Sequence, residues 1–180
     1  MKKKNNNLVY VCMAGDVLHE GHMNILKLAS SYGKLTVGLL TDNAIASYKN
    51  FPHLSYKQRH AVIKNIKYVH KVIKQETLDY SVNLNLLKPK YVVHGDDWKS
   101  GVQKRTRQNV LKVLKKWSGK LIEPAYTKNI SSTKIKKKIH DSEGILFWIT
   151  GVSGSGKSTF AKKIINNVKT NFGSSIVLHG

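Results

Sequence analysis

The chain has 180 residues, 41% of them hydrophobic, which suits one globular domain of ordinary size followed by a short remainder. It has no apolar run near the ~20 residues that span a bilayer and no signal peptide, so a cytoplasmic protein without membrane contact is expected. The net charge of +21 comes from lysines spread along the chain without a nucleic-acid-binding motif, so nucleic-acid binding is not expected.

Short apolar strands alternate with amphipathic helices along most of the chain. The expected strands are 8–12, 35–40, 69–73, 91–94 and 120–123, and the expected helices are 21–32, 55–66, 79–87, 106–117 and 131–139. This order predicts a doubly wound, Rossmann-like parallel α/β domain over residues 1–140, with its ligand site outside the carboxyl ends of the strands.

A second unit is expected over residues 141–180. After the polar stretch 141–144, the pattern predicts a strand over 145–150, a helix over 160–169 and a strand over 175–178. The boundary between the two units is placed after His140.

Two histidines open the first expected helix, in the run His19-Glu20-Gly21-His22. A helix start offers free N–H groups and a partial positive charge, and imidazoles there can donate hydrogen bonds to phosphate oxygens. Two solvent-facing histidines or a metal pair are the alternative interpretations of so short a motif. A second helix start, Ile130-Ser131-Ser132-Thr133, supplies hydroxyl groups and free amides. Two such starts in one small domain suggest a nucleoside triphosphate.

The chain resembles the cytidylyltransferase family, within the wider HxGH nucleotidyltransferase superfamily, from Val9 to about Lys138. The resemblance rests on five ordered segments: the first strand with the HxGH loop, Leu39–Asp42, Ser55 with Arg59, His94–Trp98, and the Ile-Ser-Ser-Thr run. It implies attack by an acceptor's phosphate oxygen on the α-phosphorus of CTP, release of pyrophosphate, and assistance from Mg²⁺, with no metal site assigned to protein side chains.

The same resemblance implies roles for individual residues. His19, His22 and Lys49 would be catalytic, and Lys49 and Arg59 would bind the acceptor phosphate. Lys49 has a solvated loop lysine as its alternative, Arg59 a tie between helix and loop, and Trp98 simple packing. The implied nucleotide-binding residues are Met13, Ala14, Asp16, Gly21, His94, Asp96, Asp97, Trp98, Ile130, Ser131, Ser132 and Thr133.

The acceptor is where the chain departs from the glycerol-3-phosphate enzymes of this family. They carry an arginine and a glycine where this chain has Tyr126 and Asn129, so a bidentate phosphate contact is lost. The run from His94 to Gln103 is more similar to cytidylyltransferase domains associated with phosphoenolpyruvate mutase. This similarity implies a small phosphonate or phosphate acceptor, such as 2-hydroxyethyl- or 2-aminoethylphosphonate.

Three further interpretations remain open. Adenylyl transfer from ATP is the nearest enzymatic alternative, and a nucleotide-binding module without turnover is the alternative from another class. The segment Lys67–Val72 aligns with a dimer-forming segment of the family, so a homodimer is expected, with an ordinary buried strand as the alternative.

A phosphate-binding loop pattern stands in the second unit, between an expected strand and an expected helix. Its residues are Gly151, Gly154, Ser155, Gly156, Lys157, Ser158 and Thr159. Backbone amides would surround phosphates, Lys157 would reach their oxygens, and Ser158 would contact Mg²⁺. The segment resembles the start of adenylylsulfate kinase, and an incomplete kinase unit without kinase turnover is expected.

Overall fold

The computed structural model describes residues 6–125, 127, 130–140 and 148–172, and the chain forms two compact units, residues 1–135 and 136–180. The sequence analysis placed the boundary after His140. Helix α6 (Ser132–His140) crosses the boundary between residues 135 and 136 and ends at His140, where the sequence placed it. Each unit is described separately.

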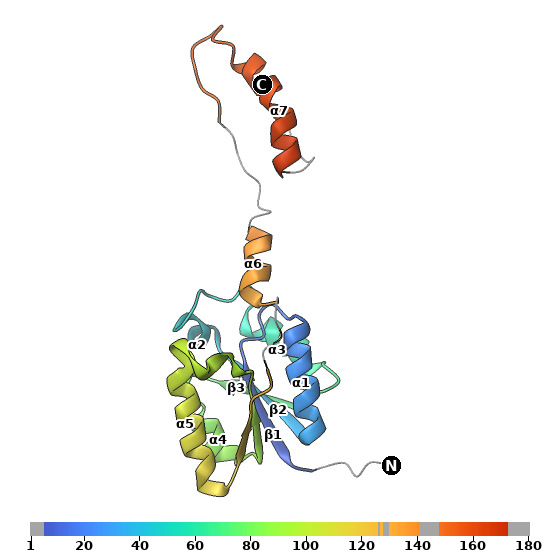
Figure 1. Ribbon diagram of the computed structural model, residues 1–180, viewed down its shortest axis with the longest axis vertical. Coiled ribbons are helices and arrows are strands. Elements are labelled where there is room, and N and C mark those ends of the chain that lie inside the picture. The colour runs from blue at the N-terminus through green and yellow to red at the C-terminus, as the bar shows by residue number, and fades with distance from the viewer. Residues whose placement is uncertain (1–5, 126, 128–129, 141–147, 173–180) are drawn as a thin grey trace. The chain divides into compact units, whose positions relative to one another are not determined.

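The first unit is built on a five-stranded sheet in the order β3-β2-β1-β4-β5 (Figure 1). Every neighbouring pair is parallel, so the predicted Rossmann-like α/β fold is confirmed. The strands are β1 (Leu8–Met13), β2 (Lys34–Leu40), β3 (Lys71–Gln75), β4 (Tyr91–Val93) and β5 (Lys120–Ile122). Because β1 is central and the connections leave it in both directions, its carboxyl end is the topological switch point where such sheets bind ligands.

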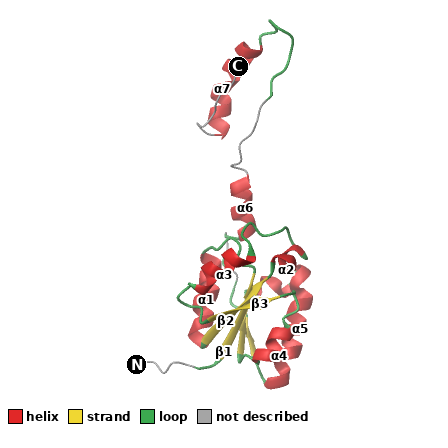
Figure 2. Cartoon of the chain, turned by 180° about the vertical axis from the view of Figure 1, so that it is seen from behind, coloured by secondary structure: helices red, strands yellow, loops and turns green. Residues whose placement is uncertain are grey.

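Helices cover both faces of this sheet (Figure 2). They are α1 (Glu20–Tyr32), α2 (Asp42–Ala46), α3 (Tyr56–Lys64), α4 (Ser81–Leu87) and α5 (Lys104–Leu114), with 3₁₀ turns at Asp96–Lys99, Gly101–Gln103 and Lys115–Trp117. The helix predicted to run to residue 117 therefore ends at Leu114 and tightens into a 3₁₀ turn. The sequence analysis missed α2, because five residues are too short to show a helical period.

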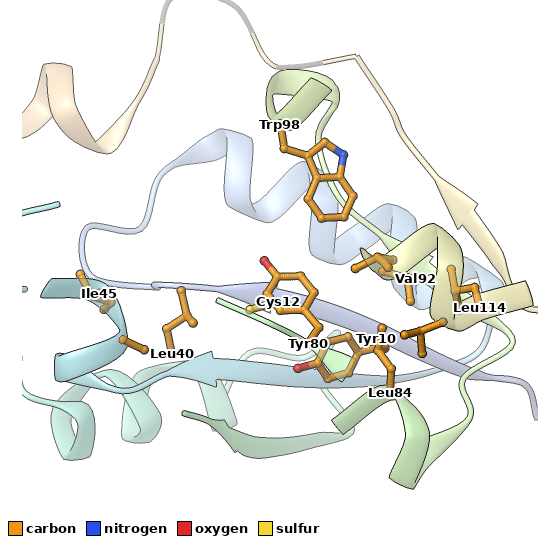
Figure 3. Close-up of a cluster of buried hydrophobic side chains, with 12 residues drawn as sticks. Tyr10, Cys12, Leu40, Ile45, Tyr80, Leu84, Val92, Trp98 and Leu114 are labelled. Atoms are coloured by element: carbon orange, nitrogen blue, oxygen red, sulfur yellow. The ribbon is translucent and has the colours of Figure 1, made fainter. Parts of the chain in front are cut away.

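Alternation along β1 divides the core into two layers. Val9, Val11 and Met13 pack with the apolar side of α1 and with Ile63 of α3. Tyr10 and Cys12 point to the other face, into a cluster that includes Tyr80, Leu84, Trp98 and Leu114 (Figure 3). A strand buried on both faces is expected at the centre of a parallel sheet.

In the second unit, the described residues contain helix α7 (Lys157–Phe172). The strand predicted over 145–150 is not formed where it can be followed, since Trp148, Ile149 and Thr150 have no regular structure and 145–147 lie outside the described residues. The strand predicted over 175–178 also lies outside them. None of the helices in the described part of the chain is both long and apolar enough to cross a membrane.

Candidate active site

A cavity of about 550 Å³ lies in the first unit, at the carboxyl ends of β1, β2 and β4. Its walls combine the end of β1, the start of α1, the loop after α2, the segment after β4 and the start of α6. The predicted site residues that line it are Met13, Ala14, His19, Gly21, His22, Lys49, His94, Asp97, Ser131, Ser132 and Thr133. The structure thus brings together most of the predicted nucleotide site from segments far apart in the sequence.

The two histidines form the N-terminal cap of α1. His19 Nδ1 accepts a hydrogen bond from the backbone N–H of Gly21 at 3.2 Å, and His22 Nδ1 accepts one from the N–H of His19 at 3.3 Å. A neutral imidazole that accepts at Nδ1 carries its proton on Nε2. Each ring is therefore fixed in the tautomer that offers an Nε2–H donor to a ligand. The ring centres are 4.0 Å apart.

Burial favours the uncharged form of both histidines. Burial lowers the pKa of His22 to about 4, with the nearby His19 and Lys49 adding to the effect, and burial also lowers the pKa of His19. Two neutral N–H donors beside a helix start suit a site where negative charge develops, since they contribute dipoles without requiring a bound proton.

The start of α6 faces the same cavity. Ser131 Oγ accepts a hydrogen bond from the N–H of Lys134 at 3.1 Å, which caps the first turn. Ser132 Oγ donates to the carbonyl oxygen of Val17 at 3.1 Å and so joins this turn to the HxGH loop. The hydroxyl groups and first amides of α6, together with α1, give the cavity two helix N-termini.

Lys49 and Asp97 place opposite charges on the cavity wall. The N–H of Lys49 donates to the carbonyl oxygen of Ile45 at 3.1 Å, so the lysine continues the last turn of α2. His94, at the end of β4, donates from Nδ1 to the Gly95 carbonyl oxygen at 2.8 Å, and burial lowers its pKa. In the neutral ring of His94 the other nitrogen, Nε2, is therefore an acceptor. The Nε2 atoms of His19 and His22 are donors instead.

Five predicted site residues do not line the cavity: Asp16, Arg59, Asp96, Trp98 and Ile130. Arg59 is completely buried and donates to backbone carbonyls and to Asp42, so the structure gives it the tie between helix and loop in place of the phosphate contact. Asp16 is also buried, and its Oδ1 accepts from the N–H of Leu54 at 2.9 Å.

Trp98 packs behind the cavity wall. Its indole lies parallel to the imidazole of His94, with ring centres 3.8 Å apart and planes 6° apart, and its side chain is fully buried. Its Nε1 donates to Glu123 at 2.8 Å, and Arg107 holds the same carboxylate through two hydrogen bonds. The Arg107 hydrogen bonds lower the pKa of Glu123 to about 2. Trp98 therefore supports His94 and does not meet a ligand itself.

The cavity also contains residues that sequence reasoning missed. They are Tyr48, Tyr80, Ser100, Gly101, Gln103 and Thr127. Gly101 to Gln103 form a 3₁₀ turn that follows Ser100, and all of them lie in the His94–Gln103 run whose family similarity could have indicated them. Tyr48 directly precedes Lys49, and that position beside a predicted site residue could have indicated it.

The loop pattern of the second unit has the backbone expected of its glycines. Gly154 and Gly156 have φ angles of +77° and +82°, and α7 begins at Lys157. The Lys157 ammonium donates to the carbonyl oxygens of Gly151 and Val152 at 2.9 and 2.7 Å. Phosphate binding there stays a prediction.

Among the described residues, no group of three histidine, cysteine or acidic side chains is arranged to hold a metal ion. Mg²⁺ is bound in many enzymes by substrate phosphates with few protein ligands.

A parallel sheet with a switch-point cavity lined by two helix N-termini defines a Rossmann-like α/β protein. The structure of a lipopolysaccharide core biosynthesis protein from Thermoplasma volcanium GSS1 shares the fold, with a TM-score of 0.59 and 22% identity over 68% of this chain and 98% of that one.

Residues 16–138 match the profile of the Cytidylyltransferase-like family, and the chain belongs to that family. It is 31% identical to ethanolamine-phosphate cytidylyltransferase of Dictyostelium discoideum over 71% of this chain and 35% of the relative. It is 29% identical to glycerol-3-phosphate cytidylyltransferase of Bacillus subtilis over 69% of this chain and 90% of the relative. The chain spans between a quarter and about a third of the ethanolamine-phosphate cytidylyltransferases that it matches.

Proposed function

We propose that the first unit transfers CMP from CTP to a small acceptor that carries a phosphate or phosphonate group, releasing pyrophosphate. One observation carries the proposal: two helix N-termini, one with His19 and His22 and one with Ser131 to Thr133, face a single cavity. Each is a site for anionic oxygen, and a triphosphate carries anionic oxygens that could meet both. The choice of CTP as the nucleotide and of cytidylyl transfer as the reaction rests on the related cytidylyltransferases.

The chemistry requires little from the protein besides position and charge stabilisation. An oxygen of the acceptor's phosphate or phosphonate is already anionic, so it forms the new P–O bond to the α-phosphorus of CTP without a general base. The bond from that phosphorus to the α,β-bridging oxygen breaks, and its electron pair leaves with pyrophosphate. The Nε2–H groups of His19 and His22 donate to the oxygens on which charge accumulates.

The other cavity residues are proposed to bind the phosphates of the two substrates. The amides and hydroxyl groups at the start of α6 hold the β and γ phosphates, since a helix N-terminus favours anions. The Lys49 ammonium approaches phosphates of both substrates and brings two anions together. Magnesium is proposed to come with the triphosphate and to offset part of its charge.

The acceptor is proposed to carry an amino group. Asp97 is the acidic side chain among the described residues that line the cavity, and His94 beside it presents an Nε2 acceptor. Both favour an ammonium over a polyol. An amino-alcohol phosphate and an aminoalkyl phosphonate share this chemistry, and the similarity of the His94–Gln103 run keeps the phosphonate in the proposal.

The test is turnover with defined pairs of substrates. The protein with Mg²⁺ is incubated with CTP or ATP and with ethanolamine phosphate, glycerol 3-phosphate, 2-aminoethylphosphonate or 2-hydroxyethylphosphonate. Pyrophosphate release and the mass of the conjugate are measured. His19→Gln is the test variant, and His53→Gln, at an exposed histidine outside the cavity, is its matched control.

A CMP conjugate that is lost in His19→Gln and kept in His53→Gln supports the proposal. Turnover with ATP alone would assign adenylyl transfer instead. No conjugate with any pair would leave a nucleotide-binding module. Asp97→Asn should reduce kcat/KM for the two amines more than for glycerol 3-phosphate, and an equal reduction would contradict the amine assignment.

We also propose a homodimer through the segment Lys67–Val72. Part of it lies in β3, an edge strand of the sheet, and an edge strand presents N–H and C=O groups to a neighbour. Sedimentation equilibrium of the full chain tests this. A monomer at all concentrations would contradict it.

A further inference from the structure

We infer that Arg59, with Asp42 and Asp16, forms a clamp that positions Lys49 at the cavity, and this role rests on the function proposed above. Arg59 and Asp16 are buried and Asp42 is partly exposed, and none of the three binds a ligand in the proposed mechanism. Arg59 has 0% exposure, although an isolated buried guanidinium would be strongly unfavourable. Its partners explain what it does.

The guanidinium joins three segments of the chain. Nε donates to the Leu54 carbonyl oxygen at 3.0 Å, one terminal nitrogen donates to the Asp42 carboxylate at 2.6 Å, and the other donates to the Ala14 carbonyl oxygen. Ala14 follows β1 and lines the cavity. The planar guanidinium of arginine holds its five donors in a fixed fork, a geometry that the compact ammonium of a lysine does not reproduce.

Asp42 and Leu54 mark the two ends of one excursion of the chain. Asp42 is the first residue of α2, and Leu54 ends the loop that follows α2. One guanidinium therefore closes the segment 42–54 at its base and fixes that base to the end of β1. Lys49 lies between the two ends, bonded through its N–H to Ile45 of α2.

Two further hydrogen bonds strengthen the same base. Asp16 Oδ1 accepts from the N–H of Leu54, so both backbone groups of Leu54 are held by charged side chains. Asp42 Oδ2 accepts from the N–H of Tyr56 at 3.2 Å, at the start of α3. The loop that carries Lys49 is thus fixed at its ends, while Lys49 itself lines the cavity.

The close packing of α3 against the β1 loop supports this assignment. Gly15 has a φ of +62°, and a Cβ there would lie 2.3 Å from Ile63 Cδ1. Ile63 is on the same helix as Arg59, so α3 contacts the β1 loop directly beside the clamp. A displaced α3 would move the base of the lysine loop and the cavity wall together.

Arg59 and Asp42 are therefore positioning residues, which act on the acceptor phosphate through Lys49. Arg59→Lys keeps the charge and loses the fork, and Asp42→Asn keeps the shape and disrupts one of the two carboxylate hydrogen bonds. A displacement of about 1 Å in a reacting group can lower a rate by about 10²-fold. We expect a reduction of about that size in kcat/KM for the acceptor in either variant, with Lys57→Met, at an exposed position of α3, as the control.

The decisive experiment is a double-mutant cycle with Lys49→Ala, combined with hydrogen exchange. If the clamp acts through Lys49, Arg59→Lys changes kcat/KM by no more than about twofold in the Lys49→Ala background. Independent, multiplicative losses would overturn the inference. If Arg59→Lys does not fold, Asp42→Asn is carried through the same cycle.

Hydrogen exchange separates this inference from the proposed function. Mass spectrometry of peptides covering residues 47–55 should show faster exchange in Arg59→Lys and in Asp42→Asn, and unchanged exchange in Lys57→Met. Unchanged exchange in both clamp variants refutes the clamp whether or not the protein turns over. Absence of turnover in the unmodified protein, with faster exchange in the variants, refutes the proposed function and keeps the structural clamp.

Discussion

The neutral state of His22 predicts how the protein responds to acid. Burial lowers the pKa of this imidazole from its ordinary 6.5 to about 4. Below pH 6.5 the unfolded chain therefore binds a proton that the folded chain does not bind until about pH 4. The stability contribution is complete above pH 6.5 and is lost as the pH falls toward 4.

The size of this effect follows from the shift. One pKa unit corresponds to about 1.4 kcal/mol, so His22 alone should lower the free energy of unfolding by about 2.5 kcal/mol between about pH 7 and about pH 4.5. Carboxylates that become protonated in the same pH range also lower the free energy of unfolding. Comparing variants with and without His22 separates their contribution from that of the histidine.

His22→Gln removes the titration and keeps a polar side chain. Urea denaturation followed by circular dichroism, at about pH 7 and about pH 4.5, should show a stability loss smaller than that of the unmodified protein by about 2.5 kcal/mol. His53→Gln, at an exposed histidine, should behave like the unmodified protein. Equal losses in His22→Gln and the unmodified protein would show that His22 is not held neutral by the fold.

Other substitutions have simpler outcomes. His19→Ala should lower kcat for CMP transfer by about 10²- to 10³-fold, as expected for one lost donor to developing charge, and a change in KM alone would contradict this. Trp98→Phe removes the indole N–H while Glu123 remains paired with Arg107, so chemical denaturation should report a loss of about 1 kcal/mol, and no loss would show that the hydrogen bond contributes nothing. Lys157→Ala, in the second unit, should leave CMP transfer within about twofold, because the proposed mechanism uses no residue of that unit, and a larger loss would implicate the second unit in the reaction.

The regular part of the fold could be predicted from the sequence because its strands are short apolar runs between clear helical periods. The sequence expected β1 over 8–12, and the structure has Leu8–Met13. The predictions that failed concern one very short helix and one expected strand. Helix α2 has too few residues to show a period, and Trp148 to Thr150, the described end of the strand expected over 145–150, have no regular structure.

The candidate site could be predicted where a residue type, a helix start and a spacing coincide, as for His19, His22 and Ser131 to Thr133. The sequence could not decide the direction of a long or aromatic side chain. Arg59 could meet a phosphate or carbonyls of its own chain, and only the packing of α3 shows that it meets carbonyls. Trp98 likewise stands in a nucleotide-binding run but turns into the core behind His94.

Helix α6 makes the border between the two units a poor place to divide this protein. Contacts separate the units between Ile135 and Lys136, yet α6 runs on to His140. A chain shortened at Ile135 would keep Ser131, Ser132 and Thr133 but only the first turn of their helix. One turn has few aligned peptide dipoles and is costly to nucleate, so its amides would not stay ordered for an anion. A fragment that is meant to keep the candidate site therefore has to extend beyond Ile135 to the end of α6.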